Sequence, residues 1–232
     1  WRVEIKAYPK LTSVGAIGNK TDSNAPAAFL TQEDVKELCA YAARRHVAII
    51  PEIDMPGHMG AVIKAYPELK HPKEERDPAK VIRGDATGRD FAKMVLAEIN
   101  SLFDPEYIHL GFDEVNYKAP VELYSKAELI DFARETTSFV KEELKKIPIV
   151  WDDVFVQGFH DKEAVVHWWR YGKKFWWKKM DTTVDERLNL KQQPFIFSPA
   201  YWTYFDMKNE GKGGWAGRIS PAEMYNWDPF GD

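Results

Sequence analysis

Apolar side chains with two different spacings alternate along the chain. In three stretches they recur every three or four positions, which predicts amphipathic helices. In five others they form short unbroken runs rich in Val, Ile and aromatic residues, which predicts buried strands. The helices are expected from Thr31 to about Ala42 and over about residues 91–103 and 122–146, and the strands at residues 47–54, 107–114, 147–153, 164–169 and 194–198, with residues 3–5 as a partial sixth.

Helices that alternate with unbroken apolar strands indicate a parallel sheet that is covered on both faces. Such a sheet closes into a barrel when eight strands are present. We therefore predict an α/β fold, a (β/α)8 barrel of the TIM type. The barrel is expected to be incomplete in these 232 residues, because the first one or two strands and the last strand are not visible. Residues 1–232 should form one catalytic domain, as an internal portion of a longer protein.

The composition excludes several classes of protein. Hydrophobic residues make up 44% and charged residues 29%, as in soluble proteins with a real core. The net charge of -4 argues against a general nucleic-acid binder, which needs an excess of cations for phosphates. No apolar run is long enough to span a membrane. A single cysteine, Cys39, excludes a disulfide within the chain.

Aromatic residues are frequent, at 14% of the chain with nine Trp. Large rings fill protein cores, but flat apolar rings also pack on the C–H faces of sugars. This abundance makes a carbohydrate ligand worth testing against the chemistry of the rest of the chain.

The strand predicted at residues 107–114 ends on two adjacent acids, Asp113 and Glu114. Burying either charge without a partner costs several kcal/mol, so the strand must end at a polar cavity or in solvent. Neighbouring side chains of a strand point to opposite faces, so the two acids share a site only where the strand runs out into its loop. In a barrel of parallel strands that place is the mouth where active sites lie. The pair is a candidate for acid–base chemistry, and a solvated strand end is the alternative.

Seven motifs, in order, resemble the catalytic domain of family 20 glycoside hydrolases, the β-N-acetylhexosaminidases. The resemblance covers nearly the whole chain, and its strength lies in the order of the motifs rather than in any one of them. The motifs are residues 1–5 (WRVEI) with 8–12 (YPKLT), 51–58 (PEIDMPGH), 109–114 (HLGFDE), 151–153 (WDD), 168–170 (WWR), 198–201 (SPAY) with 204–206 (YFD), and 215–217 (WAG).

The resemblance implies a retaining exo-glycosidase that removes terminal β-linked N-acetylglucosamine or N-acetylgalactosamine. The substrate supplies the nucleophile: the carbonyl oxygen of its 2-acetamido group attacks the anomeric carbon and forms an oxazolinium intermediate. Glu114 would be the general acid and then the base that activates water. Asp113 would orient the acetamido N–H and stabilise the developing positive charge. Such chemistry needs one acid to keep its proton while its neighbour stays ionised.

The same resemblance assigns supporting residues. Asp54 would hydrogen-bond the orienting acid and His58 would contact the general acid, although a lone histidine is more often structural. His109, within its strand, is expected to have a hydrogen-bonded core role instead. Tryptophans would wall the sugar pocket, although each of them could also fill core. The expected substrate-binding residues are Trp151, Trp168 (preferred to Trp169, which faces the other side of the strand), Tyr204, Asp206 and Trp215.

The resemblance implies no cofactor and no metal, a glycan or glycoconjugate as partner, and a secreted, periplasmic or lysosomal location; it leaves the oligomeric state open. The chain departs from the family at Phe112, where a small residue is usual, so the ring must be accommodated behind the strand. The family's sugar-binding arginine in the first strand, the Trp-x-Glu of the eighth, and an aspartate that partners His58 are not visible. This absence is a further reason to expect an internal portion of a longer enzyme.

Two alternatives stay open. Acids at the strand ends could form a divalent metal site, as in metal-dependent barrel hydrolases. No His-x-His spacing supports that site, for which the candidate ligands are Asp54, His58, Asp113, Glu114, Asp152 and Asp153. The other alternative is a non-catalytic barrel that binds glycans without turnover.

Overall fold

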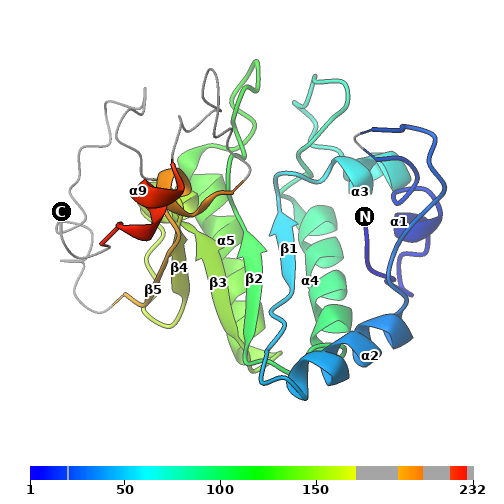
Figure 1. Ribbon diagram of the computed structural model, residues 1–232. Coiled ribbons are helices and arrows are strands. Elements are labelled where there is room, and N and C mark those ends of the chain that lie inside the picture. Colours follow the sequence, from blue (N-terminus) through cyan, green and yellow to red (C-terminus); the bar gives the residue numbers. More distant parts are fainter. Residues whose placement is uncertain (20, 171–192, 206–219, 229–232) are drawn as a thin grey trace. The chain divides into compact units, whose positions relative to one another are not determined.

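The computed structural model describes residues 1–19, 21–170, 193–205 and 220–228 (Figure 1). The chain divides into two compact units, residues 1–160 and residues 161–232. Each unit is described by itself below. The candidate acids Asp54, Asp113, Glu114, Asp152 and Asp153 lie in the first unit.

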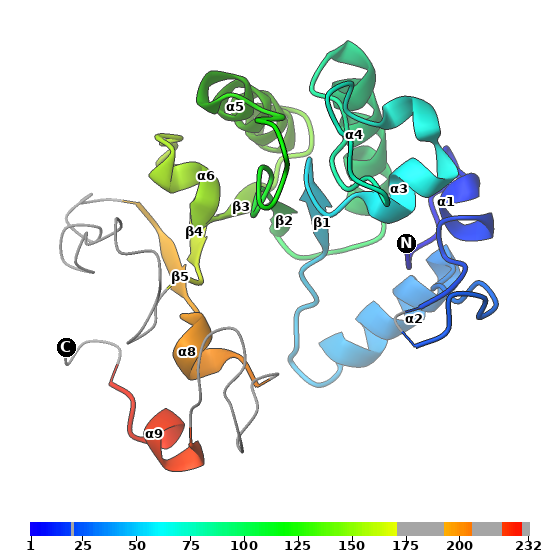
Figure 2. The same cartoon turned by 90° about the horizontal axis from the view of Figure 1, so that it is seen from above.

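The first unit is built around three parallel strands, β1 (Glu52–Met55), β2 (Tyr107–Gly111) and β3 (Ile147–Trp151), which lie side by side in that order. Helices α4 (Ala86–Asn100) and α5 (Lys126–Glu142) connect them and cover one face of the sheet (Figures 1 and 2). The carboxyl ends of the three strands therefore point to the same edge. The predicted alternation of helices with parallel strands is confirmed.

Packing between the sheet and the helices makes the core of this unit. On β1 the buried residues Ile53 and Met55 alternate with the more accessible Glu52 and Asp54. The helices present matching apolar stripes, and the fully buried residues of α4 and α5 include Phe91, Val95, Ile99, Leu129, Phe132 and Val140. Because the apolar side chains of β1 are buried, its acidic side chains are left on the other face of the strand.

Several boundaries differ from the prediction. β1 begins at Glu52 rather than at residue 47, and Val47 and Ile50 at the start of that apolar run are exposed. α4 begins at Ala86, before the expected residue 91. α2 (Gln32–Ala43) starts at the expected Thr31, whose hydroxyl accepts from the N–H of Asp34 in a capping box. Leu38 shares the helical spacing of Val35 and Ala42, but it is 42% exposed whereas those two residues are buried.

The remaining elements are short. Val3 forms only an isolated parallel bridge to Leu30, so the partial strand expected at residues 3–5 is reduced to one pair. The other elements of the first unit are α1 (Lys10–Ser13), α3 (Gly60–Ala65), the 3-10 helix η1 (Pro67–Leu69) and α6 (Asp152–Val156).

The second unit contains a pair of parallel strands, β4 (Val165–Trp168) and β5 (Phe195–Phe197), in which Val166 is in register with Phe195. Two short helices follow, α8 (Ala200–Thr203) and α9 (Pro221–Tyr225). The described residues thus contain all five expected strands, fewer than the eight of a closed barrel. Within these same ranges, no helix has the length and apolar character needed to cross a bilayer.

Candidate active site

The chain turns sharply where β2 ends, and this turn brings the two acids out together. β2 ends at Gly111, and Phe112 and Glu114 adopt positive φ angles of 76° and 51°. The regular alternation of a strand is therefore broken at Asp113, as expected for two adjacent acids that share a site.

The absence of a side chain at Gly111 makes room for Asp54. A Cβ atom on Gly111 would lie 1.8 Å from Asp54 Oδ1, and the glycine has a φ of +77°. Asp54 Oδ1 instead accepts the backbone N–H of Phe112 at 3.2 Å. The carboxyl group of β1 thus packs directly against the backbone of the turn that carries the acid pair.

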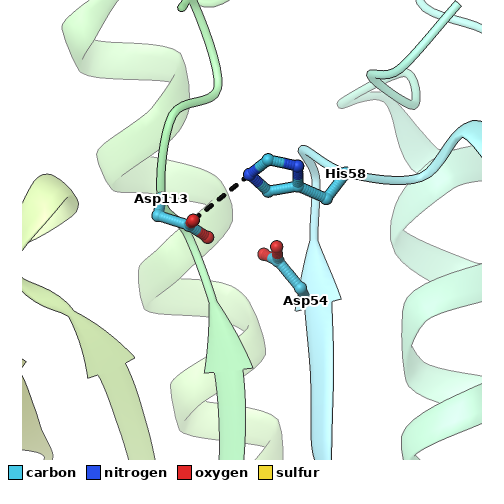
Figure 3. Close-up of side chains that lie close together, drawn as sticks. All are labelled: Asp54, His58 and Asp113. Atoms are coloured by element: carbon cyan, nitrogen blue, oxygen red, sulfur yellow. Dashed lines mark ion pairs between the residues drawn. The ribbon is translucent and has the colours of Figure 1, made fainter. Parts of the chain in front are cut away.

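Asp54, His58, Asp113 and Glu114 come together between the ends of β1 and β2 (Figure 3 shows the first three). His58 Nε2 lies 3.2 Å from Asp113 Oδ2 and 3.6 Å from Glu114 Oε2. One carboxyl oxygen of Asp54 lies within 4.8 Å of one of Asp113. The structure thus brings these four predicted residues together, and their roles stay predictions.

The pKa values of Asp54 and Asp113 are shifted in opposite directions. Burial, together with the charge of Asp113 and a hydrogen bond to it, raises the pKa of Asp54 to about 10. Burial also opposes ionisation of Asp113, but hydrogen bonds from His58 and Asp54 and the charge of His58 outweigh it and lower the Asp113 pKa. The hydrogen bond to Asp113 raises the pKa of His58. These shifts favour a protonated Asp54, an ionised Asp113 and a protonated His58.

Asp54→Asn is expected to stabilise the fold, and increasingly so as the pH rises from 5 to 8. The pKa of the Asp54 carboxyl is 3.8 in the unfolded chain and about 10 in the folded protein, so the wild-type protein becomes less stable as the pH rises between these two values. The amide of the variant does not titrate, so it does not have this loss. The gain should grow by up to about 1.4 kcal/mol for each pH unit in this range. Urea unfolding of both proteins at the two pH values measures it, and a difference independent of pH would contradict the assigned proton.

Asp153, in α6 just after β3, hydrogen-bonds the turn that carries Asp113 and Glu114. The sequence did not single it out as a supporting residue. Its Oδ1 accepts the backbone N–H of Glu114 at 3.0 Å. Asp153 is buried in the first turn of α6, where helix N–H groups favour an acid. The run of two aspartates directly after β3 was the available signal, because it repeats the pattern of acids at the end of β2.

Phe112 is accommodated behind the strand, as expected. Its ring is fully buried and meets Phe132 of α5 with ring centroids 5.9 Å apart. Phe132 in turn lies 6.3 Å from the ring of Tyr124, whose hydroxyl donates to the backbone oxygen of Ile82. This packing offsets the strain of a bulky residue at positive φ and attaches the turn to α5.

Phe112→Gly is expected to be more stable than Phe112→Ala by about 1 kcal/mol, although both lose about 3 kcal/mol or more through the lost ring. Alanine is strained at a φ of 76° and glycine is not. Phe132 supplies the control, since in the middle of α5 alanine should be the more stable of the same two replacements. Chemical denaturation measures the free energy of unfolding of the four variants. If Phe112→Ala is more stable than Phe112→Gly, the backbone at position 112 is not strained.

The candidate aromatic residues fall in both units. Trp151, at the end of β3, donates its indole N–H to Glu52 Oε1 at 2.9 Å. In the second unit Trp168 and Trp169 are both buried, and the Trp169 ring stacks on Tyr204 with centroids 6.4 Å apart. The preference for Trp168 stays a prediction. Asp206 and Trp215 lie outside the described residues.

A cation could be held by three of the six candidate metal ligands. Atoms of Asp54, His58 and Asp113 lie within 4.8 Å of one another, on oxygen and nitrogen donors that divalent metals accept. The proton on Asp54 would have to leave before that carboxyl could bind a cation. Asp153 is already engaged by the backbone of Glu114.

Comparison with known proteins places this geometry in a family. The model of the glycosyl hydrolase family 20 catalytic domain matches residues 1–232. A β-hexosaminidase of Porphyromonas gingivalis is 33% identical over 189 residues, which cover 72% of this chain and 24% of that protein.

Solved structures agree with the family match. The family 20 β-N-acetylhexosaminidase of Streptomyces coelicolor has a TM-score of 0.81 and 26% identity, over 99% of this chain and 46% of that one. The family 20 exo-β-N-acetylglucosaminidase of Vibrio harveyi, in complex with N-acetylglucosamine, has a TM-score of 0.78 and 27% identity, over 100% of this chain and 40% of that one. The predicted TIM-type α/β fold is confirmed. The chain spans less than half the length of these relatives.

Proposed function

Since this chain belongs to glycosyl hydrolase family 20, we propose that the protein carrying it removes terminal β-linked N-acetylhexosamine from glycans or glycoconjugates. The reaction retains the anomeric configuration and uses the substrate's own 2-acetamido group as the nucleophile. The similarity to β-hexosaminidases and to an enzyme solved with N-acetylglucosamine supports this substrate class.

One observation carries the proposal: Asp113 and Glu114 both lie beside His58 where β2 ends. His58 Nε2 lies 3.2 Å from Asp113 Oδ2, and the hydrogen bond and charge of His58 lower the pKa of Asp113. A fixed carboxylate there can accept the acetamido N–H, aim the acetamido oxygen at the anomeric carbon, and stabilise the positive charge that develops on the ring.

Glu114 completes the reaction as the proton carrier. In the first step it protonates the leaving oxygen while the acetamido oxygen forms the new bond to the anomeric carbon. In the second step it takes a proton from water, which opens the oxazolinium ring and regenerates the acid. His58, 3.6 Å from Glu114 Oε2 and 3.2 Å from Asp113 Oδ2, positions both acids relative to each other.

The aromatic residues supply the walls of the sugar site in this proposal. Trp151 walls the acetamido group, and the sugar-binding roles expected for Trp168, Tyr204, Asp206 and Trp215 stay predictions. Trp151 lies at the end of β3 and hydrogen-bonds Glu52, which belongs to the same strand as Asp54.

The proposal is tested with aryl N-acetyl-β-glucosaminide and the matching galactosaminide, with NMR of the released sugar. We expect hydrolysis of at least one, with the β-anomer formed first and full activity in a strong chelator. Activity abolished by the chelator and restored by a divalent metal would favour metal-dependent hydrolysis at Asp54, His58 and Asp113. Sugar binding without turnover would identify a non-catalytic glycan-binding protein.

A further inference from the structure

Three side chains beside the acid cluster contact one another, and only one of them, Trp151, has a part in the function proposed above. They are Glu52 on β1, His109 on β2 and Trp151 on β3. Glu52 is in register with His109, and His109 is in register with Ile149, two residues before Trp151. Since alternate residues of a strand share a face, the three side chains lie on one side of the sheet, the side that also bears Asp54.

Their contacts fix the orientation of the Trp151 indole. Its Nε1–H donates to Glu52 Oε1 at 2.9 Å, and one ring face meets the His109 ring with centroids 4.7 Å apart and planes inclined at 54°. His109 is itself anchored, because its Nδ1 accepts the backbone N–H of Gly111 at 3.1 Å. An indole has two side-chain torsions, and one hydrogen bond with one ring contact restrains both of them.

Glu52 is an unusual residue for a purely structural role. Its side chain is 44% exposed, yet burial of the carboxyl and the nearby charge of Asp113 raise its pKa. Glu52 Oε1 lies 3.7 Å from His109 Nδ1, but that nitrogen already accepts the backbone N–H of Gly111 and so donates no proton to the carboxyl group. What it gains is the indole N–H, at the strand end that bears the candidate sugar-binding tryptophan.

We propose that Glu52 is a positioning residue that fixes the plane of Trp151 and thereby sets the size of the 2-acyl group that the site accepts. This inference rests on the proposed function, in which Trp151 walls the acetamido group. The acyl oxygen is the nucleophile, so a wall that tilts moves the reacting oxygen away from the anomeric carbon. A tilted wall also admits a longer acyl chain.

Two substitutions separate the hydrogen bond from the bulk of the side chain. Glu52→Gln keeps an oxygen that can accept the indole N–H, whereas Glu52→Leu keeps a similar volume without an acceptor. Each is assayed on the aryl N-acetyl and N-propionyl glucosaminides. For Glu52→Leu we expect kcat/KM on the N-acetyl substrate to fall roughly tenfold, mostly through kcat. The acyl ratio, which is kcat/KM on the N-acetyl substrate divided by kcat/KM on the N-propionyl substrate, should decrease several-fold. Glu52→Gln should keep the wild-type ratio within about twofold.

Trp151→Phe gives an independent variant, since it keeps an aromatic wall without the N–H group. It should narrow the acyl ratio as Glu52→Leu does, and the double variant should narrow it no further, because both changes remove the same bond. This arm remains informative if Glu52→Leu unfolds, which a thermal melt reports.

An acyl ratio unchanged in Glu52→Leu or in Trp151→Phe would overturn the positioning role, since a merely structural defect lowers kcat/KM equally on both substrates. So would strictly multiplicative effects in the double variant. Failure of the proposed function looks different, because the wild-type protein itself would then hydrolyse neither substrate.

Discussion

Glu114→Gln is expected to lower kcat/KM by roughly 10³-fold on an aryl N-acetylglucosaminide whose leaving group is a weak acid. The amide cannot deliver a proton to the departing oxygen. A dinitrophenolate leaves without that proton, so kcat/KM on the dinitrophenyl substrate should fall by less than about tenfold. On that substrate kcat should still fall, because the second step lacks its base.

Steady-state kinetics over a series of leaving groups measures this dependence. Glu122→Gln is the matched control, an exposed glutamate in the loop after β2 whose amide should leave the kinetics unchanged. A Glu114→Gln loss that is the same for every leaving group would mean that Glu114 does not protonate the leaving oxygen.

Asp113→Asn is expected to lower kcat/KM by roughly 10²- to 10³-fold, equally for good and poor leaving groups. The variant loses the negative charge that orients the acetamido N–H and stabilises the cationic ring, and neither task depends on the leaving group. The same substrate series therefore distinguishes the two adjacent acids: the loss in kcat/KM should depend on the pKa of the leaving group for Glu114→Gln and should be independent of it for Asp113→Asn.

His58→Gln tests what keeps Asp113 ionised. His58 lowers the pKa of Asp113 through a hydrogen bond and its charge. Without the charge this pKa rises, so the acidic limb of the kcat/KM profile should move to higher pH. An acidic limb that stays in place would show that the ionisation of Asp113 does not set it.

The sequence could predict the site because each candidate acid follows an apolar run that cannot bury it. Asp54 and Asp113 stand at the ends of neighbouring parallel strands, and parallel strands end at one edge. The same reasoning found the helices, whose caps at Thr31 and Ser125 are local features of the sequence.

Other features depend on contacts that no local pattern encodes. Apolar spacing grouped Leu38 with the buried stripe of α2, but exposure is decided by what packs against the helix. From the sequence, charge repulsion between the adjacent Asp113 and Glu114 was expected to separate their pKa values, so that one acid keeps its proton and the other is ionised. The structure instead couples Asp113 to Asp54, 59 positions earlier in the sequence, through the space left by Gly111.

The Glu52–Trp151 hydrogen bond is of the same kind. It joins residues 99 positions apart, from the two outer strands of the three in the first unit, across His109 on the strand between them. Local sequence patterns mark each of these residues as a strand end or a core residue and say nothing about their contact. Pairing across a sheet therefore decides which side chains support the acid pair.

The central claim is that the substrate's acetamido group is the nucleophile, and one comparison tests it most directly. The protein is assayed on an aryl N-acetyl-β-glucosaminide and on the aryl β-glucoside with the same leaving group. Because an oriented internal nucleophile replaces a bimolecular attack, we expect the plain glucoside to react at least about 10³-fold more slowly. Equal rates on the two substrates would contradict the mechanism.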